Sequence, residues 1–318
     1  MNVGIDVSPL LQTRAGTARY VEHLLEHLPD LVRLSFGRAG RVWAAARDAW
    51  WYPVALPRAA RGLDVLHCPT FRGPLRCPVP LVITVHDLAV LRHPGTFNQW
   101  SRQYSRLAVP RVAQAARLIV AVSEFTKREL VELLGVPPAK IRVIPNGVAD
   151  VFSPDGPAAS GEYLLAVGTL EPRKNLAAAE EAARRLGLEL RVAGERGWGD
   201  VGANGWLGRV SDERLAELLR GARALVYPSL YEGFGLPVAE AMACGTPVVT
   251  GKGGATEEVA GGAAVLVDPR DVASIAAGIE EALGRREELA RRGLERARAF
   301  SWKAAAEATA AVYREAAG

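Results

Sequence analysis

Two glutamates eight residues apart are the strongest candidates for chemistry in this sequence. Glu232 and Glu240 lie in the segment YPSLYEGFGLPVAEAMACGTPVV, which begins at Tyr227, at the end of an expected strand. At this spacing both carboxylates can face one ligand, and a carboxylate that accepts hydrogen bonds from paired hydroxyls is a natural way to hold a sugar. A single glutamate at such a place is more often a solvated surface residue, so the prediction depends on the whole segment.

The turn between these glutamates predicts a binding site for an anion or a hydroxyl. Pro237 suits the first turn of a helix. The backbone N–H groups of Phe234, Gly235 and Leu236 are therefore expected to point out of a helix N-terminus, which attracts anions and hydroxyls.

Two adjacent cations follow another expected strand. In VGTLEPRKNL the strand ends at Gly168, and Arg173 and Lys174 come after it. Arg173 offers a planar fork of donors for phosphate oxygens, and Lys174 offers a compact charge. Taken alone, an Arg-Lys pair is more often a basic helix cap exposed to water, so a role in phosphate binding depends on the other segments.

A histidine and an aspartate end a third expected strand. The apolar run in LVITVHDL leads directly into His86 and Asp87, which are placed for hydrogen bonding or proton transfer. His67, in DVLHCPTF, occupies a similar strand end and is an alternative, and a lone histidine at such a place is more often structural.

Two glycine-containing loops complete the candidate segments. Gly16, in LLQTRAGTARY, would let the backbone approach a ligand closely. The loop GKGGATEEVAGG carries Glu257 and Glu258, for which stabilisation by a helix dipole is the favoured interpretation.

The composition is that of an ordinary folded protein and argues against several classes of function. The chain has 318 residues, of which 49% are hydrophobic and 23% charged, and its formal net charge is +4. No apolar run is long enough for a transmembrane helix, and the N-terminus, MNVGIDVSPLL, is typical of a first strand rather than a signal peptide. The arginines are scattered without interleaved aromatic residues, which disfavours nucleic acid as a partner.

Cysteine usage agrees with a cytoplasmic location. Cys68, Cys77 and Cys244 lack metal-ligand spacing, and we interpret them as reduced structural thiols. We therefore expect a cytoplasmic protein without a metal site. Peripheral contact with the inner face of the membrane stays open, as does the oligomeric state.

The elements that must position these residues alternate between short β-branched runs and longer amphipathic stretches, which is typical of an α/β fold with parallel sheets. Strands are expected at Val3–Val7, Leu31–Phe36, Asp64–His67, Leu81–Val85, Leu118–Val122, Arg142–Ile144, Tyr163–Gly168, Glu189–Ala193, Leu207–Val210, Ala224–Tyr227, Pro247–Thr250 and Ala264–Val267. Helices are expected near residues 17–28, 97–116, 124–134, 175–186, 212–220, 237–243 and 271–283. Ser123 and Ser211 are expected to cap two of these helices.

A turn-rich segment, Val143–Asp155, is the best domain boundary. We place an N-terminal domain at residues 1–148 and a C-terminal domain at 149–301. Two such units in series predict two Rossmann-like, doubly wound domains, whose ligands bind at the carboxyl ends of the strands.

Together these segments resemble the retaining glycosyltransferases of family 4, a GT-B group that includes many bacterial mannosyltransferases. The similarity is strongest over Leu164–Pro269, where AVGTLEPRKN, GRVSDERL, the Glu232/Glu240 segment and the Gly-rich Glu-Glu loop occur in the family's order. The resemblance implies two doubly wound domains that face each other across a cleft, with the final helix, within residues 302–318, packed back on the first domain.

The resemblance also implies roles for the C-terminal candidates. Glu240 would bind the ribose hydroxyls of the donor, and Glu232 would bind hydroxyls of the donor sugar with help from the amides at 234–236. Arg173 and Lys174 would hold the pyrophosphate and stabilise it as it leaves.

The remaining roles carried over concern the base and the N-terminal domain. The backbone near Val210 would read the base, with Leu215 packed beside it. His86 would face the sugar and the acceptor, with Asp87 nearby, and Gly16 would lie close to the pyrophosphate.

The reaction implied is transfer of a hexosyl group with retention of anomeric configuration. We find no Asp-x-Asp motif of the metal-dependent GT-A enzymes, so Arg173, Lys174 and the helix N-terminus at Gly235 are expected to supply the positive potential. The donor is expected to be GDP-mannose, because EPRKN resembles mannosyl enzymes, with UDP-sugars next, and no other cofactor is expected. The acceptor would be a glycan, a lipid-linked saccharide or a small molecule.

Two departures from the family pattern affect these expectations. Where relatives often have Gly-Gly-x-Gly, this chain has Ala15-Gly16-Thr17-Ala18, and the region Gly37–Pro57, with Trp43, Trp50 and Trp51, is short. Ordinary packing of these indoles is favoured over an acceptor platform or membrane contact.

Two other classes of function are weighed against the transferase. A sugar-nucleotide epimerase or a phosphorylase could use the same fold, and a pyridoxal-dependent phosphorylase would have only Lys174 and Lys252 at suitable loops. A protein that only binds a nucleotide sugar, without catalysis, would not need to keep all five candidate residues, which are Arg173, Lys174, Glu232, Glu240 and His86.

Overall fold

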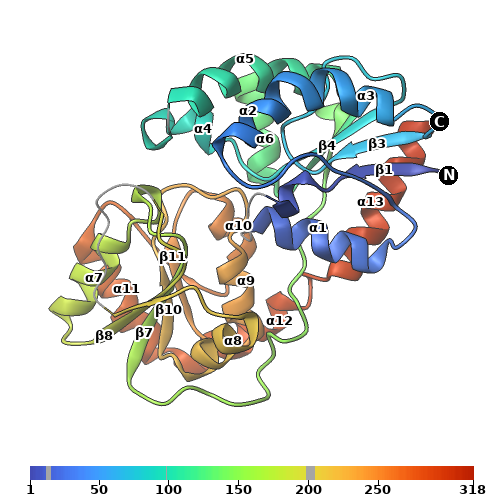
Figure 1. The fold of residues 1–318 in the computed structure, drawn as a ribbon. Coiled ribbons are helices and arrows are strands. Elements are labelled where there is room, and N and C mark those ends of the chain that lie inside the picture. Colours follow the sequence, from blue (N-terminus) through green and yellow to red (C-terminus); the bar gives the residue numbers. More distant parts are fainter. Residues whose placement is uncertain (12–15, 98, 198–204) are drawn as a thin grey trace. The chain divides into compact units, whose positions relative to one another are not determined.

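The computed structural model describes residues 1–11, 16–97, 99–197 and 205–318, and the chain divides into two compact units (Figure 1). Unit 1 comprises Met1–Gly147 together with Trp302–Gly318, and unit 2 comprises Val148–Ser301. Each unit has its own six-stranded sheet, in which every pair of neighbouring strands is parallel. The predicted α/β class with two parallel sheets is therefore confirmed.

The unit 1 sheet has the order β2-β1-β3-β4-β5-β6. Its strands are β1 (Val3–Asp6), β2 (Val32–Leu34), β3 (Val65–Cys68), β4 (Leu81–Val85), β5 (Leu118–Ala121) and β6 (Ile141–Val143). Strands β1, β3, β4 and β5 are buried at every residue. This pattern arises because helices cover both faces of a parallel sheet, so that side chains on either face are removed from water.

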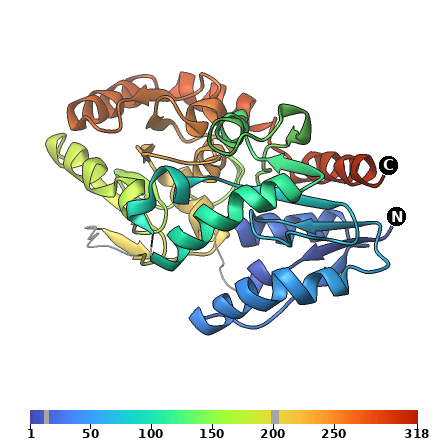
Figure 2. The same cartoon turned by 90° about the horizontal axis from the view of Figure 1, so that it is seen from above.

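The helices of unit 1 form two layers, one on each face of its sheet. They are η1 (Ser8–Leu11), α1 (Gly16–His27), α2 (Arg41–Ala46), the π-helical η2 (Arg47–Ala55), α3 (Leu56–Ala59), α4 (Ala89–Arg92), η3 (Pro94–Thr96), α5 (Gln99–Ala115), α6 (Glu124–Leu134), η4 (Pro138–Lys140) and α13 (Trp302–Ala317). Helices α1 and α13 lie side by side along one face, and α2, α3 and α5 cover the other (Figures 1 and 2). The core cluster under the second layer includes Trp51, Leu56 and Val109.

Helix α13 reaches unit 1 from the far end of the chain, and a glycine permits its approach. It packs on α1 and on strands β3, β4 and β5. A Cβ atom placed on Gly147 would lie 2.1 Å from the backbone nitrogen of Trp302. Because such a contact is impossible, only glycine fits at residue 147, just where the chain would otherwise collide with the start of α13.

The unit 2 sheet has the order β12-β11-β10-β7-β8-β9. Its strands are β7 (Tyr163–Val167), β8 (Glu189–Ala193), β9 (Trp206–Gly208), β10 (Ala224–Tyr227), β11 (Val248–Gly251) and β12 (Val265–Val267). Its helices are η5 (Pro172–Lys174), α7 (Leu176–Arg185), α8 (Asp212–Gly221), α9 (Leu236–Ala243), α10 (Ala255–Ala260), α11 (Val272–Gly284) and α12 (Arg286–Ala297).

Both predicted serine caps are present. The Ser123 hydroxyl accepts a hydrogen bond from the backbone nitrogen of Thr126 at 3.0 Å, and Ser211 accepts one from Arg214 at 3.3 Å. Some expected bounds are wrong. The expected 97–116 helix is α5, which begins at Gln99. Strand β9 ends at Gly208, so Val210 lies beyond it, in the connection to α8.

Candidate functional site

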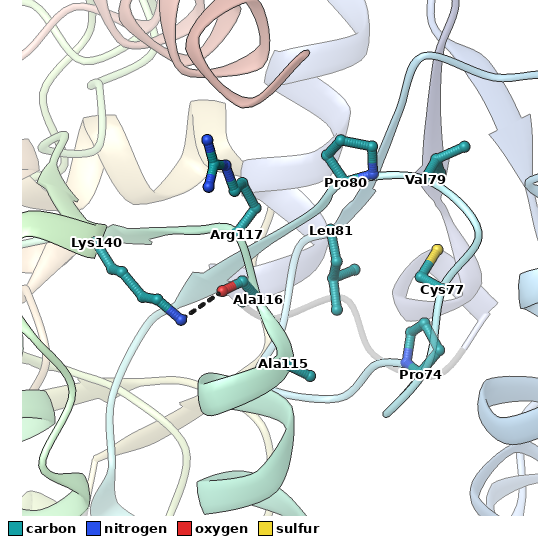
Figure 3. A pocket seen from close by; sticks show the side chains of 9 residues that line it. All are labelled: Pro74, Cys77, Val79, Pro80, Leu81, Ala115, Ala116, Arg117 and Lys140. Atoms are coloured by element: carbon teal, nitrogen blue, oxygen red, sulfur yellow. Dashed lines mark hydrogen bonds between the residues drawn. The ribbon is translucent and has the colours of Figure 1, made fainter. Parts of the chain in front are cut away.

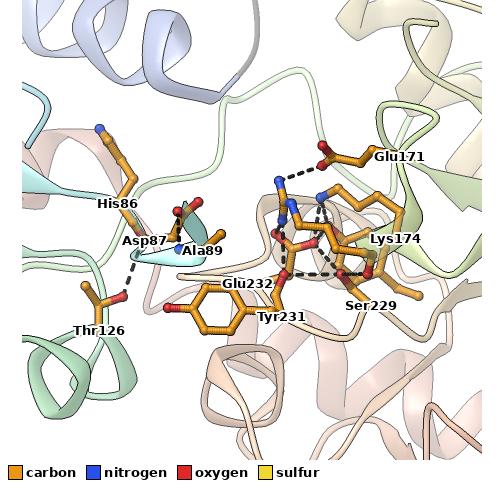
Figure 4. Close-up of polar contacts among 11 residues, drawn as sticks. His86, Asp87, Ala89, Thr126, Glu171, Lys174, Ser229, Tyr231 and Glu232 are labelled. Atoms are coloured by element: carbon orange, nitrogen blue, oxygen red, sulfur yellow. Dashed lines mark hydrogen bonds and ion pairs between the residues drawn. The ribbon is translucent and has the colours of Figure 1, made fainter. Parts of the chain in front are cut away.

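The first candidate group lies in unit 2, where the ends of two neighbouring strands bring together a carboxylate and two cations. Strands β7 and β10 are paired in parallel, so their carboxyl ends meet at one edge of the sheet. Arg173 and Lys174 form the end of η5, which follows β7, and Glu232 follows β10. Lys174 Nζ lies 2.5 Å from Glu232 Oε1 (Figure 4). Arg173 Nη1 lies 3.1 Å from Glu232 Oε2.

Neighbouring polar side chains hold this ion-pair group in place. The hydroxyls of Tyr227 and Ser229 donate to Glu232 Oε1 at 2.8 Å and 2.6 Å. Arg173 Nη2 lies 2.7 Å from Glu171 Oε1, and that carboxylate is only 3% exposed. Glu232 therefore receives two cations and two hydroxyls, while Arg173 is shared between two carboxylates.

Burial and the neighbouring charges have opposite effects on the pKa of Glu232. Burial alone would raise the pKa of Glu232, but Lys174 and Arg173 outweigh it and lower that pKa from 4.5 to about 2. Burial and the adjacent Glu232 carboxylate raise the pKa of Tyr227 well above 10. At neutral pH the carboxylate is therefore ionised and the phenol is a neutral hydrogen-bond donor.

The turn after Glu232 has the geometry that its glycines predict. Gly235 adopts a left-handed backbone with φ 99° at the N-terminus of α9, and Pro237 lies in the first turn. Among the residues that the structure describes, neither the Phe234 nor the Gly235 amide donates a hydrogen bond. Glu240 lies farther along the same helix and is 1% exposed. These features make the start of α9 suited to a polar or anionic ligand.

Two further predicted donor-binding residues lie close to the start of α8, one before the helix and one within it. Val210 lies in the connection before Ser211, and Leu215, which is 7% exposed, sits in the first turns of α8. In the described part of the chain, neither residue forms a hydrogen bond or an ion pair with Glu232. The structure therefore gives their positions without grouping them with the ion-pair group.

The second candidate group lies in unit 1, at the carboxyl end of β4. His86 Nε2 lies 3.0 Å from the carbonyl oxygen of Pro69. A carbonyl can only accept, so Nε2 carries the proton. Burial lowers the pKa of His86, against opposing effects of the Pro69 carbonyl and Asp87, so the ring is neutral and its Nδ1 is an acceptor.

A cavity of about 200 Å³ adjoins His86. Its lining is Pro9, Thr17, Tyr52, Thr70, Phe71, Arg72, His86 and Asp87. Arg72 forms an ion pair with Asp48, in which Nη1 lies 3.1 Å from Oδ1. The Asp87 carboxylate accepts from the amide of Ala89 at 3.0 Å, which fixes it at the start of α4 (Figure 4). The cavity thus combines aromatic walls with several hydrogen-bonding groups.

His67, the alternative histidine, has a structural environment. It is fully buried, with Nδ1 2.7 Å from the Tyr313 hydroxyl and Nε2 2.9 Å from the Thr84 hydroxyl. Burial lowers its pKa to about 3. A neutral imidazole bonded on both sides joins α13 to the sheet and has no free nitrogen for a ligand.

The other predictions fall at element starts. Gly16 is the first residue of α1 and is exposed, whereas Ala15 lies outside the described residues. Glu257 and Glu258 occupy the first turn of α10, as the helix-dipole interpretation requires. Sequence reasoning missed Glu171, Tyr227 and Ser229, although all three stand in loops or at a strand end beside candidate residues.

A second cavity, of about 250 Å³, lies at the opposite edge of the unit 1 sheet, where β4 begins (Figure 3). Its lining includes Cys77, Leu81, Arg117 and Lys140. Lys140 Nζ donates to the carbonyl oxygens of Gln114 and Ala116 at 3.1 Å and 3.2 Å. Because these carbonyls lie at the C-terminal end of α5, this lysine acts as a helix cap.

The described part of the chain contains neither a membrane-spanning helix nor a cluster of side chains suited to a metal ion. None of the helices there is both long and apolar enough to span a bilayer. No cluster of three or more His, Cys, Asp or Glu side chains suited to a metal ion occurs among the described residues either.

Comparison with known proteins assigns these features to one class of enzyme. The family "Glycosyl transferases group 1" matches residues 155–300, and "Glycosyltransferase Family 4" matches residues 4–151. O-antigen chain mannosyltransferase B of Escherichia coli is 34% identical over 282 residues, covering 79% of this chain and 74% of that protein. D-inositol 3-phosphate glycosyltransferase of Geodermatophilus obscurus is 31% identical over 350 residues, covering 96% and 71%.

Solved structures share the whole fold at lower identity. Sucrose-phosphate synthase of Thermosynechococcus elongatus gives a TM-score of 0.76 at 20% identity, covering 99% of this chain and 98% of that one. Anabaena Alr3699/HepE in complex with UDP and glucose gives 0.79 at 17% identity, covering 98% and 99%. The fold is that of GT-B enzymes. The chain belongs to glycosyltransferase family 4 and is a glycosyltransferase that uses a nucleotide-sugar donor.

Proposed function

We propose that this enzyme transfers a mannosyl group from GDP-mannose, with retention of anomeric configuration, to a saccharide, a lipid-linked saccharide or a small hydroxylated acceptor. Support for mannose comes from two relatives, O-antigen chain mannosyltransferase B and the MMP alpha-(1->4)-mannosyltransferase of Mycolicibacterium hassiacum, which is 33% identical over 277 residues. UDP-sugars are the next candidates.

The observation that carries this proposal is the convergence of Arg173 and Lys174 on Glu232 at the carboxyl end of the unit 2 sheet. In our proposal the two cations bind the donor diphosphate and stabilise its charge as it leaves. Glu232 and the amides at 234–236 bind hydroxyls of the donor sugar, and Glu240 binds those of the ribose. The backbone near Val210 and the side chain of Leu215 contact the base.

The demanding step is departure of a nucleoside diphosphate, because negative charge grows on the leaving oxygen. Fixed cations and helix N-termini stabilise such charge without reorganising at the moment of reaction. Arg173, Lys174 and the start of α9 provide this in unit 2, and we therefore propose that the enzyme needs no divalent metal.

In unit 1 we propose that His86 orients the acceptor or the sugar. Its Nε2–H is committed to Pro69, so Nδ1 accepts a hydrogen bond from a substrate hydroxyl. The depressed pKa keeps this nitrogen unprotonated at neutral pH. In a front-face reaction the leaving phosphate takes the proton of the acceptor hydroxyl. His86 then polarises that hydroxyl but does not remove its proton. Asp87 and Gly16 assist substrate binding in this proposal.

The test is a binding panel of GDP, UDP, ADP and their sugars by calorimetry, with and without Mg²⁺. We expect one nucleotide to bind clearly best, GDP first, with an affinity that does not depend on metal. Absence of binding by every nucleotide would contradict the donor site, and a clear preference for UDP would replace the mannosyl assignment while keeping the site.

A further inference from the structure

Asn175 lies between η5 and α7 and has an unusual backbone conformation. Its φ is 56° and its ψ is 36°, which is the left-handed conformation. Among the residues that the structure describes, it is the only one other than glycine with a positive φ. Asparagine tolerates this conformation better than most residues do, but glycine tolerates it at least as well. The backbone alone therefore does not account for an asparagine at this position.

The side chain of Asn175 does not cap its own helix. An asparagine at a helix start usually accepts a hydrogen bond from a backbone N–H of the first turn, but within the described residues Asn175 makes no such bond. Its Nδ2 lies instead 3.2 Å from the carbonyl oxygen of Pro228 and 2.5 Å from that of Pro269. Carbonyls only accept, and the amide nitrogen carries two hydrogens, so this one side chain donates to both acceptors.

These two hydrogen bonds join three loops at the carboxyl edge of the unit 2 sheet. The segment η5 follows β7, Pro228 directly follows β10, and Pro269 lies shortly after the end of β12. In the sheet, β12 is separated from β10 by β11. The Asn175 amide therefore links the loop after β7 to the loop after the outermost strand on that side.

The loop that Asn175 ends carries the two cations of the ion-pair group. Arg173 and Lys174 directly precede Asn175. The carbonyl oxygen of Arg173 accepts a hydrogen bond from the amide of Leu230, in the loop after β10, at 2.8 Å. This bond and the Asn175 amide hold consecutive parts of the loop. Long cationic side chains are aimed accurately only when the backbone that carries them is held in place.

We infer that Asn175 is a positioning residue for the donor diphosphate, because its amide fixes η5 and thereby the direction of Arg173 and Lys174. The inference rests on the proposed role of these two cations in diphosphate binding. It adds that their placement depends on a side chain that donates two hydrogen bonds, beyond a residue that accepts the left-handed backbone. Asn175 acts through the cations and does not itself contact the substrate.

The variant that tests this inference is Asn175→Gly, which keeps the left-handed backbone and removes the amide. The probes are GDP and guanosine, or UDP and uridine where the nucleotide panel favours uracil, measured by calorimetry and NMR titration. We expect the affinity for the diphosphate to fall roughly tenfold, the scale of one hydrogen bond to a charged group. The affinity for the nucleoside, which has no phosphate, should stay within about twofold. If the residue served only its backbone conformation, glycine would replace it without loss.

A second variant, Asn175→Asp, keeps the size of the side chain and also tolerates the left-handed backbone. An ionised carboxylate cannot donate to either carbonyl, so we expect it to lose at least as much diphosphate affinity as Asn175→Gly. The matched control is Gln114→Ala in unit 1, which removes an amide that donates to the carbonyl oxygen of Leu134 at 3.2 Å. This control should bind both probes like the unmodified chain.

A double variant shows whether Asn175 acts through the cations. In the Lys174→Ala background, Asn175→Gly should cost clearly less diphosphate affinity than it does alone, because one of the two groups that it positions is absent. Losses at independent sites would instead add within about twofold.

Several outcomes would overturn the inference: additive losses, an equal fall for the nucleoside, a loss in Gln114→Ala of the same size, or full diphosphate affinity in either Asn175 variant. If Lys174→Ala alone leaves diphosphate affinity unchanged, the proposed diphosphate site is wrong and the inference fails with it. A loss in Lys174→Ala without one in Asn175→Gly would overturn the inference and leave the proposed function in place.

Discussion

Replacing Glu232 by glutamine tests whether the ion-pair group of unit 2 is as tightly coupled as its geometry indicates. Glutamine keeps the size of the side chain and can accept hydrogen bonds from Tyr227 and Ser229, but it removes the charge that faces Lys174 and Arg173. Those cations, 10% and 16% exposed, would then be nearly buried with less compensation. Loss of one partner from a buried ion pair is strongly destabilising.

The pKa of Glu232 gives the magnitude. A shift from 4.5 to about 2 corresponds to about 3 kcal/mol of stability at neutral pH. For a unit of this size, each kcal/mol moves the melting temperature by roughly 2–4 °C. We therefore expect Glu232→Gln to lower the melting temperature of unit 2 by about 6–12 °C at pH 7.

The pH dependence provides the sharper measurement. The folded-state pKa is lower than the unfolded one, so the stabilisation is fully present above about pH 5 and is lost as the pH falls towards 2. The difference between the unmodified chain and Glu232→Gln should thus fall to less than half its neutral value by about pH 3. Effects of other carboxylates cancel in this difference.

The assay is thermal and urea unfolding, followed by circular dichroism, of both proteins from pH 7 to pH 3. Glu288→Gln is the matched control, since Arg285 and Arg292 also lower the pKa of Glu288 to about 2. That side chain is 43% exposed, and solvent screens such pairs, so its removal should leave the melting temperature unchanged. Equal melting temperatures for Glu232→Gln and the unmodified chain, or a gap between them that does not change with pH, would refute the reasoning.

Three further outcomes follow from the proposed function. Lys174→Ala should reduce kcat at least a hundredfold, roughly what loss of one positioned charge costs, and full turnover in this variant would remove its role in phosphate binding. Glu240→Ala should weaken GDP binding by about 1–3 kcal/mol in calorimetry, whereas unchanged affinity would show that it holds no ribose hydroxyl. Dialysis against EDTA should leave the transfer rate unchanged, and activity that returned only with Mn²⁺ would contradict the metal-free mechanism.

Much of the framework could be predicted from the sequence, because short β-branched runs and serine caps act locally. The strand ending at Val85 and the helix that begins after Ser123 depend on residues within a few positions of each other. The turn at Gly235 is also local, since a left-handed backbone followed by proline is dictated by the residues themselves. For these elements the chain pattern and the tertiary structure agree.

The helical stretch from α2 through η2 to α3 was not predicted, and its sequence explains why. Proline at residue 53 lies inside η2, and proline normally interrupts a helix. Here the backbone adopts π-helical geometry, which changes the spacing of hydrogen bonds. Of the three indoles, only Trp51 is buried, at 6% exposure. The favoured expectation of ordinary packing is thus right for Trp51, whereas Trp43 and Trp50 are 39% and 48% exposed.

Side chains that converge from distant segments could not be predicted from local pattern. His67 and His86 end neighbouring strands and look equivalent in the sequence. Only the packing of α13 distinguishes them, because Tyr313, 246 residues away, takes up one nitrogen of His67. Similarly, Tyr227 acquires its role from Glu232 and Lys174, which meet it only when β7 and β10 pair.

The charge balance of the unit 2 group bears on how a diphosphate can bind there. Arg173 and Lys174 contribute two positive charges, and Glu171 and Glu232 contribute two negative ones, so the group as it stands is neutral. If the two cations hold the diphosphate, we expect its oxygens to compete with Glu232 for Lys174, whose ammonium already donates to Glu232 and to Tyr227. The same exchange frees a carboxylate oxygen to accept sugar hydroxyls. Phosphate binding and sugar binding would therefore be coupled through Glu232, and a nucleotide sugar should bind more tightly than its nucleoside diphosphate, a gain that Glu232→Gln should remove.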